Sequence, residues 1–220
     1  MKRLLDSNPV GGLRLTPEER RSGLIDAALR SIIKHGQAGL SVRAVCQEAG
    51  VSAGLLPHHF PGKDALIVEA YRKLTEDIYT QINETLEAAS GSSSEDKLRL
   101  FIELSFKQPV LNADFFRIWL VFWNLSQQQS EIAKLRDEVN RKVVNSLQTL
   151  IEGVAQDAAL EQVNFRLAAI GLSGLMDGLW LEWSLNPAGF SPEEATEICQ
   201  CWVDALLSGG LGRLATVTSS

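Results

Sequence analysis

Ala53, Leu55 and His58 are the residues best placed to do chemistry, because they fall in the second helix of a predicted helix-turn-helix. Residues 41–60 (SVRAVCQEAGVSAGLLPHHF) have the pattern of a short amphipathic helix, a tight turn and a second helix. Gly50 suits the left-handed backbone that ends the first helix. The second helix of such a unit enters the major groove of DNA, so these three side chains are expected to face DNA. An ordinary helical hairpin is the alternative interpretation.

Polar and cyclic residues of the same segment predict its local geometry. Ser41 and Ser52 can each cap a helix, since a hydroxyl accepts a backbone N–H two or three residues further on. Pro57 lacks a backbone N–H and is expected to end or distort the second helix after one turn. Phe60 is expected to anchor the segment in the core rather than to contact a base.

No catalytic constellation follows from the rest of the chain. The three histidines are His35, His58 and His59, all in the N-terminal part. The sequence has no Gly-rich phosphate loop, no nucleophile elbow and no paired-histidine metal motif. We therefore expect no catalytic residues, no metal site and no cofactor, and predict that the protein is not an enzyme.

An aromatic cluster further along the chain suggests a ligand site. The candidate ligand-binding residues are Phe115, Trp119, Trp123, Asp177 and Trp180. Trp119 and Trp123 share a helix face, and such rings can hold a quaternary ammonium through cation–π attraction, at about 0.5–2 kcal/mol per contact. Asp177 could pair with a cationic ligand or with an arginine such as Arg166. Ordinary core packing is the alternative for each tryptophan taken singly.

The helix expected over residues 164–185 is apolar on two sides. The candidate subunit-interface residues are Gly171, Gly174, Gly178 and Leu181, with Trp202 on the last helix. Each glycine weakens a helix by about 1 kcal/mol relative to alanine, a cost that the close approach of another helix would offset. A helix with its own core on one side and a second subunit on the other predicts a homodimer. A helix central to a monomer is the alternative.

The whole chain is predicted to be all-α, with about nine helices, no alternating strand pattern and no internal repeat. Thr16 and Ser191 each begin a capping box that is followed by proline. The Ser/Gly-rich stretch 90–94 is expected to be a loop. The predicted helices cover residues 16–36, 41–50, 52–60, 63–89, 95–106, 114–125, 131–157, 164–185 and 191–207.

Charge is unevenly distributed along the 220 residues, whose net charge is −6. Residues 1–75 contain eleven Lys/Arg and seven Asp/Glu, whereas residues 76–220 contain ten and twenty. This asymmetry predicts a DNA-facing end and an acidic body. No apolar run is long enough to cross a bilayer, and no secretory signal is expected. An odd number of cysteines (Cys46, Cys199 and Cys201) indicates reduced thiols and a cytoplasmic location, with no membrane partner.

Residues 49–66 (AGVSAGLLPHHFPGKDAL) resemble the signature of the TetR family of one-component repressors. The matching positions are Gly50, Val51, Ser52, Gly54, Leu56, His59, Phe60, Lys63 and Leu66. Residues 117–125 (RIWLVFWNL) and 175–181 (LMDGLWL) are similar to the BetI-like branch, whose best-known member controls choline and glycine-betaine genes. The family usually has tyrosine where this chain has Pro57, and proline cannot supply the contact between a phenol and a phosphate that the resemblance would imply.

The resemblance implies a DNA-binding surface, a ligand pocket among the aromatic residues and dimerisation through the last two helices. Ser52, His59 and Lys63 are then expected at DNA phosphates, and the full set of expected DNA contacts is Ser41, Arg43, Ser52, Ala53, Gly54, Leu55, His58, His59 and Lys63. The expected organisation is a mobile arm at 1–15, a helix-turn-helix DNA-binding domain at 16–62, a helical ligand-binding and dimerisation domain at 63–208, and a mobile tail at 209–220.

Together these features predict a cytoplasmic, dimeric transcriptional repressor that binds a palindromic operator. A small-molecule effector, for which choline-like or betaine-like compounds are the first candidates, would release it from DNA. Two alternatives remain open at this point. One is a DNA-binding dimer that has no ligand, which a filled core around the tryptophans would favour. The other is a helical enzyme or carrier, which an absence of salt-sensitive DNA binding would favour.

Overall fold

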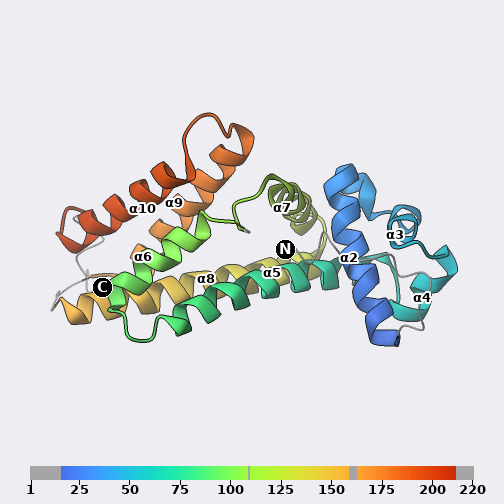
Figure 1. Ribbon diagram of the computed structural model, residues 1–220, viewed down its shortest axis with the longest axis horizontal. Helices are drawn as coiled ribbons and strands as arrows, with labels where there is room; N and C mark the ends of the chain where they lie inside the picture. The colour runs from blue at the N-terminus through green and yellow to red at the C-terminus, as the bar shows by residue number, and fades with distance from the viewer. Residues whose placement is uncertain (1–15, 109, 159–162, 212–220) are drawn as a thin grey trace. The chain divides into compact units, whose positions relative to one another are not determined.

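The computed structural model describes residues 16–108, 110–158 and 163–211, and these parts are almost entirely helical (Figure 1). They contain nine α-helices and two short 3-10 helices, and no strand occurs among them. The all-α prediction is therefore confirmed for this part of the chain. The expected arm at 1–15 lies outside the described residues, as does most of the expected tail.

The described residues form two compact units. Of the described residues, the first unit contains 16–78 and 113–137, and the second contains 79–108, 110–112, 138–158 and 163–211. Two long helices, α5 (Lys63–Ala88) and α8 (Ser130–Asp157), each contribute to both units. This grouping reflects packing alone, and the predicted domain boundary at residues 62 and 63 stays a prediction.

Helix α2 (Pro17–His35) opens the first unit and begins with the predicted capping box. Thr16 Oγ1 accepts the backbone N–H of Glu19, and the Glu19 carboxylate accepts the backbone N–H of Thr16. Gly36 ends the helix with a φ of 58°, which favours glycine. The 3-10 helix η1 (Gly36–Leu40) then leads to the helix-turn-helix.

Gly39 in η1 allows this segment to lie directly against α2. A Cβ at this position would lie 2.2 Å from the carbonyl oxygen of Ser31, which is closer than real Cβ atoms come to other atoms. The Ser31 hydroxyl donates a hydrogen bond of 2.8 Å to the Gly39 carbonyl, so the close approach also satisfies a buried hydroxyl. Gly39 therefore sets the distance between α2 and the segment that leads into the helix-turn-helix.

The helix-turn-helix consists of α3 (Val42–Ala49), η2 (Ala53–Leu55) and α4 (Leu56–His59). Gly50 ends α3 in the left-handed conformation, with φ 69° and ψ 30°, as predicted. The second helix is not one continuous α-helix, because it begins as a 3-10 turn and continues as one α-helical turn. Pro57 explains the change, since it has no N–H to complete an α-helical bond to Ala53.

The core of the first unit joins α2, α3, α4, the first half of α5 and α7 (Ala113–Ser126). Figure 1 shows α2, α3 and α4 gathered at the N-terminal end of α5. The α7 helix packs on α2 and η1, and Asn124 Nδ2 donates a hydrogen bond of 3.1 Å to Gln37 Oε1. Buried side chains that form this core include Leu24, Ile32, Val45, Leu56, Phe60, Leu66, Tyr71 and Phe122.

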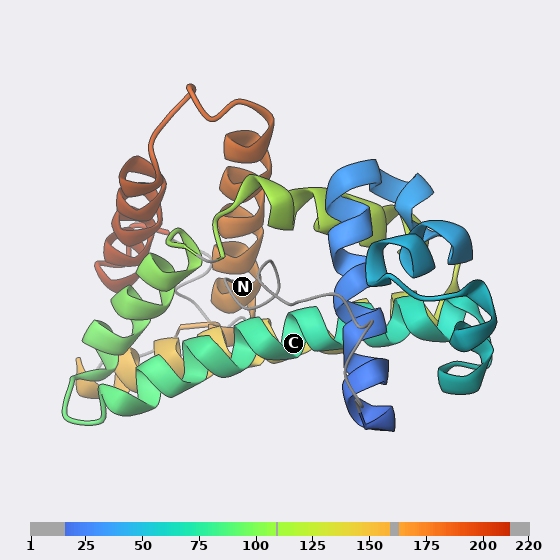
Figure 2. The same cartoon turned by 45° about the vertical axis from the view of Figure 1, so that its right-hand side comes forward.

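The second unit contains α6 (Ser94–Ser105), α9 (Phe165–Leu185), α10 (Pro192–Leu207) and the later parts of α5 and α8. Tyr79 of α5 is hydrogen-bonded to Ser146 of α8 at 2.6 Å, and Arg99 of α6 forms an ion pair with Asp204 of α10 at 2.6 Å. Figure 2 shows α9 and α10 joined by a loop as a helical hairpin, and the two helices contact each other. Capping boxes begin α6 at Ser93 and α10 at Ser191.

Two further sequence expectations concern cysteines and membranes. Cys46 and Cys199 are buried and Cys201 is exposed, and all three are free thiols. Within the described ranges, no helix is long and apolar enough to span a bilayer.

Candidate functional site

The residues expected to contact DNA lie on an accessible surface of the first unit. Seven of them are exposed (Ser41, Arg43, Ser52, Ala53, Gly54, His58 and Lys63), and Leu55 and His59 are half-buried. The structure places α3, the recognition segment Ala53–His59 and the first residue of α5 in the same unit, where α3 and α4 each contact α2 and η2. Their roles at DNA stay predictions.

Ser41 and Ser52 both lie on this surface, but only Ser41 caps a helix. The Ser41 hydroxyl accepts the backbone N–H of Ala44 at 3.2 Å, so it caps α3 as predicted. Ser52 stands at the equivalent position before the recognition segment, with extended backbone angles, but its hydroxyl makes no capping hydrogen bond. The prediction that Ser52 caps the second helix was wrong, because that segment begins as a 3-10 turn whose first bond runs from Leu55 N–H to the Ser52 carbonyl.

Buried anchors hold the recognition segment against the unit. Leu56 and Phe60 are both buried, and the prediction that Phe60 is a core anchor is confirmed. The Arg21 guanidinium of α2 lies over the Phe60 ring, 4.9 Å from its centroid. These contacts fix the end of the segment, so the exposed side chains between Ser52 and His59 project from a rigid base.

Ion pairs fix α2 relative to its neighbours. Glu48 of α3 receives Arg30 Nε at 3.1 Å and Lys34 Nζ at 2.6 Å. Burial alone would raise the pKa of Glu48, but the hydrogen bonds and positive charges of Lys34 and Arg30 hold that pKa below its usual value. On the α5 side, Lys73 pairs with Asp26 at 3.2 Å. Arg30, Lys34 and Lys73 are therefore each paired with a carboxylate of the same unit.

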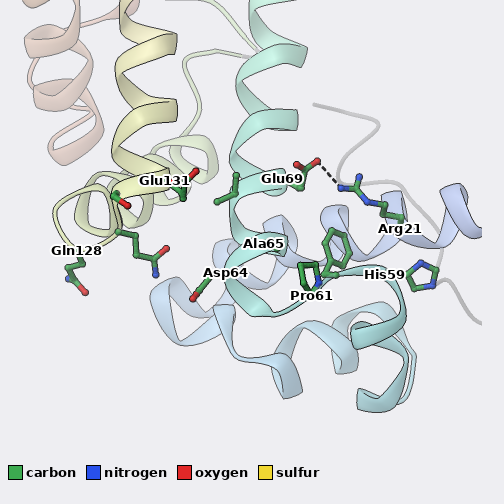
Figure 3. Close-up of a pocket in the computed structure, with 12 residues that line it drawn as sticks. Arg21, His59, Pro61, Asp64, Ala65, Glu69, Gln128 and Glu131 are labelled. Carbon is green, nitrogen blue, oxygen red and sulfur yellow. Dashed lines mark ion pairs between the residues drawn. The ribbon is translucent and has the colours of Figure 1, made fainter.

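A groove of about 700 Å³ lies beside the recognition segment in the first unit (Figure 3). Its lining comes from the end of α4, the first turns of α5, Arg21 of α2 and the turn that precedes α8. Figure 3 shows the Arg21–Glu69 ion pair, at 2.9 Å, near His59 and Pro61, with Gln128 and Glu131 on the other side. The carboxylates of Asp64, Glu69 and Glu131 make this groove unsuitable for an anion, and none of the residues expected to bind the effector lines it.

The aromatic residues of α7 form a cluster in the first unit, which we call the α7 cluster (Phe115, Trp119, Phe122 and Trp123, with Tyr71 of α5). Phe115 and Phe122 are buried, whereas Trp119 and Trp123 are half-buried. The Trp119 ring centroid lies 5.9 Å from that of Phe115 and 5.8 Å from that of Trp123. The predicted grouping of these three residues on one helix is therefore present.

Tyr71 is a member of this cluster that the sequence interpretation missed. Its ring stacks on Phe122 with centroids 4.5 Å apart, and it meets Trp119 edge-on at 5.6 Å. Its position four residues after the buried Ile67 could have indicated a second apolar face of α5.

Asp177 and Trp180 belong to the second unit, on α9. The Asp177 side chain is exposed at the surface, yet the protein around it displaces enough water to raise the pKa of Asp177 to about 6. No ion pair between Asp177 and Arg166 occurs in the described parts of the chain, so the structure does not provide the arginine partner that was one alternative. A carboxylate in this setting would gain from a cation.

The residues expected at a subunit interface divide into two groups. Gly174 and Gly178 are exposed, and a Cβ at either position would meet nothing within 4 Å. A Cβ at Gly171 would lie 3.2 Å from Trp202 Cζ2, so this glycine allows α9 to approach α10 within one chain. Leu181 and Trp202 are half-buried.

Exposed apolar side chains continue the open glycine face of α9 and α10. Leu167 and Ile170 are each 41% exposed, Ile198 is 44% exposed and Leu185 is 64% exposed. Leu167, Ile170 and Leu185 share one stripe of α9 with Gly174 and Gly178 by their helical spacing. We call this stripe, together with the exposed Ile198 of α10, the α9–α10 face. An apolar surface of this kind is typical of a protein–protein contact.

Comparison with protein families agrees with both halves of this description. Residues 24–70 match the model of bacterial regulatory proteins of the tetR family. Residues 94–208 match the model of the C-terminal part of BetI-type transcriptional repressors.

Similar proteins give the same result over most of the chain. The HTH-type transcriptional regulator BetI of Burkholderia thailandensis is 32% identical over 201 residues, which cover 91% of this chain and 98% of that protein. The protein of the same name from Vibrio campbellii is 28% identical over 192 residues, which cover 87% of this chain and 94% of that protein.

Solved structures resemble the chain closely. The crystal structure of a transcriptional regulator from Pseudomonas aeruginosa PAO1 has a TM-score of 0.84 and 38% identity, over 91% of this chain and 96% of that one. A regulator from Saccharomonospora viridis, in complex with choline, has a TM-score of 0.76 over 85% of this chain and 96% of that one. Its identity is 21%, so it supports the shared fold.

The helix-turn-helix, the helical second half and these similarities lead to one conclusion. The chain belongs to the TetR family of bacterial regulatory proteins, in its BetI-type branch, and is a DNA-binding transcriptional regulator and not an enzyme.

Proposed function

We propose that the protein is a homodimeric repressor that acts in the cytoplasm, binds a palindromic operator and is released by a small organic cation. The observation that carries the DNA part is the exposed surface of Arg43, the recognition segment and Lys63. Neither Arg43 nor Lys63 has an ion-pair partner within the described parts of the chain. Their charges are therefore available to DNA phosphates, which supply most of the affinity of such proteins.

The base-reading part of the proposal assigns Ala53, Leu55 and His58 to the major groove. The recognition helix consists of a 3-10 turn and one α-helical turn that contains Pro57, so few side chains can reach base edges. Ser52, whose hydroxyl is not used in capping, is proposed to donate to a phosphate together with His59 and Lys63. Ser41 and Arg43 at the start of α3, and the Gly54 backbone, are proposed to lie along the same DNA strand.

Dimerisation is proposed through the α9–α10 face, with Gly174 and Gly178 where the two subunits approach most closely. Their open positions would let a partner helix come near, and the apolar side chains around them would be removed from water. A two-fold dimer presents two recognition segments and so requires two related half-sites in the operator. Leu181 and Trp202 are proposed to contribute from the border of the same face.

The effector is proposed to be a quaternary ammonium compound such as choline. Support comes from the half-buried indoles of Trp119 and Trp123 beside the buried Phe115, and from the BetI-type match. Asp177 of the second unit supplies a carboxylate that makes no ion pair with any residue the structure describes, and Trp180 is on the same helix. We propose each of these residues as a ligand contact, to be tested one at a time. The choline complex of the Saccharomonospora viridis regulator, which has the same fold, suggests choline as the first compound to test.

A single set of measurements tests this proposal. Selection of binding sequences from a random DNA pool should return a palindrome, and fluorescence anisotropy should show salt-sensitive binding to it. Choline should then lower the affinity of the protein for the selected DNA, and Trp119→Ala should abolish that response while DNA binding remains. Selection of a sequence with a single half-site, or a monomer in sedimentation at micromolar concentration, would contradict the dimeric reading.

A second candidate is a DNA-binding dimer that takes no ligand. The tight packing of Phe115, Tyr71 and Phe122 favours it, because a filled aromatic core leaves less room for a compound. The two candidates differ in calorimetry. Choline-like cations should give binding heat that Trp119→Ala removes if the effector proposal is right, and no metabolite should bind if the second candidate is right.

A further inference from the structure

Tyr71 lies at the centre of the α7 cluster and is fully buried. One side of its ring is stacked on Phe122, and the edge of Trp119 meets it from another direction. Trp119 is itself half-buried, so Tyr71 is covered by a residue that is partly open to solvent.

The hydroxyl of Tyr71 is buried and has no hydrogen-bond partner among the described residues. Burial raises the pKa of the Tyr71 phenol, so the group remains a neutral donor. A buried hydroxyl without a partner costs stability, and phenylalanine would fill the same space without that cost. Tyr79, the other tyrosine of the chain, differs in this respect, because its hydroxyl is bonded to Ser146 at 2.6 Å.

We propose that Tyr71 determines specificity in the effector site, with its hydroxyl donating a hydrogen bond to an oxygen atom of the bound cation. This inference rests on the proposed effector function and adds to it the part of the ligand that is recognised. The indoles of Trp119 and Trp123 hold the ammonium group, and a small rotation of Trp119 opens the way to the hydroxyl. A quaternary ammonium with an oxygen two carbons away is then preferred over one with only carbon there.

The position of Tyr71 also connects ligand recognition with DNA binding. Tyr71 lies on α5, whose first residue is Lys63, and its neighbour α7 is hydrogen-bonded to η1 through Asn124 and Gln37. If the hydrogen bond from Tyr71 to the effector can form in only one of two conformations of the protein, the effector binds that conformation more tightly. Tyr71 therefore lies where a difference in effector affinity between conformations can change the positions of α7 and the first half of α5, which belong to the same unit as the recognition segment.

The first test compares the thermal stability of two matched variants without any ligand. Tyr79→Phe should lower Tm by about 2–4 °C, because it removes a hydrogen bond from a protein of this size. Tyr71→Phe should leave Tm unchanged or raise it. A fall in Tm for Tyr71→Phe equal to that for Tyr79→Phe would show that the Tyr71 hydroxyl already has a partner, and would overturn the inference.

The second test compares choline with propyltrimethylammonium, which has the same shape but a methyl group in place of the hydroxyl. The parent protein should bind choline about five-fold more tightly, as expected for one net hydrogen bond. Tyr71→Phe should bind the two compounds equally, and Tyr79→Phe should keep the preference. Comparing two ligands with two protein variants in this way assigns the preference to a hydrogen bond between the Tyr71 hydroxyl and the choline hydroxyl.

The outcomes separate the inference from the proposal on which it rests. If the parent protein prefers choline and Tyr71→Phe keeps the full preference, the inference is wrong and the effector proposal stands. If the parent protein binds neither compound, the proposed effector class is wrong, and the inference that Tyr71 binds this ligand is wrong as well. Loss of the preference in Tyr71→Phe alone supports both.

Discussion

The positively charged side chains of the DNA-binding part fall into two classes at the residue scale. Arg21, Arg30, Lys34 and Lys73 are held in ion pairs with carboxylates of neighbouring helices. Lys63 is exposed at the start of α5, where the backbone N–H groups of the helix also favour an anion. The first class holds the fold together, and we expect the second to act on DNA.

Replacement of Lys63 should therefore weaken binding to all DNA sequences alike. Lys63→Ala should reduce the slope of log affinity against log salt by about 0.9, as expected for one lost phosphate contact. His58→Ala should instead change the preference between sequences. Anisotropy titrations at several salt concentrations measure both effects. Lys134→Ala, which removes an exposed lysine on α8, is the control. An identical salt slope for Lys63→Ala and Lys134→Ala would show that Lys63 does not contact a DNA phosphate.

Asp177 should make cation binding depend on pH. Its pKa is raised to about 6, so the carboxyl group is largely protonated at pH 5 and ionised at pH 7. The affinity for choline should increase over this range, because only the ionised form attracts the cation. The free energy of unfolding should change in the opposite direction, because the folded protein disfavours the ionised form of Asp177. Stability should therefore rise as the pH falls from about 6, the pKa of Asp177 in the folded protein, towards 3.8, its pKa in the unfolded chain. Calorimetry at three pH values should find a flat profile for Asp177→Asn, and an unchanged pH dependence in this variant would show that Asp177 does not contact the cation.

At the scale of elements, the approach of η1 to α2 depends on a single glycine. Gly39→Ala would place a Cβ 2.2 Å from a backbone oxygen of α2, and that oxygen cannot move without bending the helix. We expect a loss of about 1–3 kcal/mol in the free energy of unfolding, which is typical of overpacking. Urea denaturation measures the change.

Gly62→Ala is the matched control for this variant, because a Cβ at Gly62 meets nothing within 4 Å. It should leave the free energy of unfolding nearly unchanged. If Gly39→Ala were as stable as Gly62→Ala, the close packing of η1 on α2 would not exist in solution.

At the scale of the whole molecule, the α9–α10 face should decide the oligomeric state. Gly174→Leu fills open space in the single chain, and leucine favours a helix by up to about 1 kcal/mol over glycine. The variant should therefore fold normally but lose dimerisation through overlap with the partner subunit. Sedimentation should show a monomer, and operator affinity should fall because two half-sites are no longer bound together.

Gly91→Leu provides the corresponding control, because Gly91 also faces open space but lies in the loop before α6. It should remain a dimer with unchanged operator affinity. A dimeric Gly174→Leu would place the subunit interface elsewhere on the molecule.

Most of the helices could be predicted from the sequence because their signals are local. Thr16, Ser41 and Ser191 cap the helices that they were expected to cap, and Gly36 and Gly50 end the helices that they were expected to end. Apolar periodicity located the later helices to within one or two residues, as in the predicted 131–157 against the observed Ser130–Asp157. Capping and periodicity involve residues a few positions apart, so neither depends on the rest of the fold.

Contacts between distant residues were decided only by the tertiary structure. The same glycine stripe on α9 contains Gly171, which accommodates Trp202 of its own chain, and Gly174, which faces open space. Tyr71 lies next to Trp119, 48 positions away, and its buried hydroxyl has no sequence signal at all. Ser52 has the residue type of a cap, but the 3-10 start of its segment leaves the hydroxyl unused. Residue type and spacing determine which groups a helix offers on each face, whereas the packing of one helix on another determines which of those groups meet.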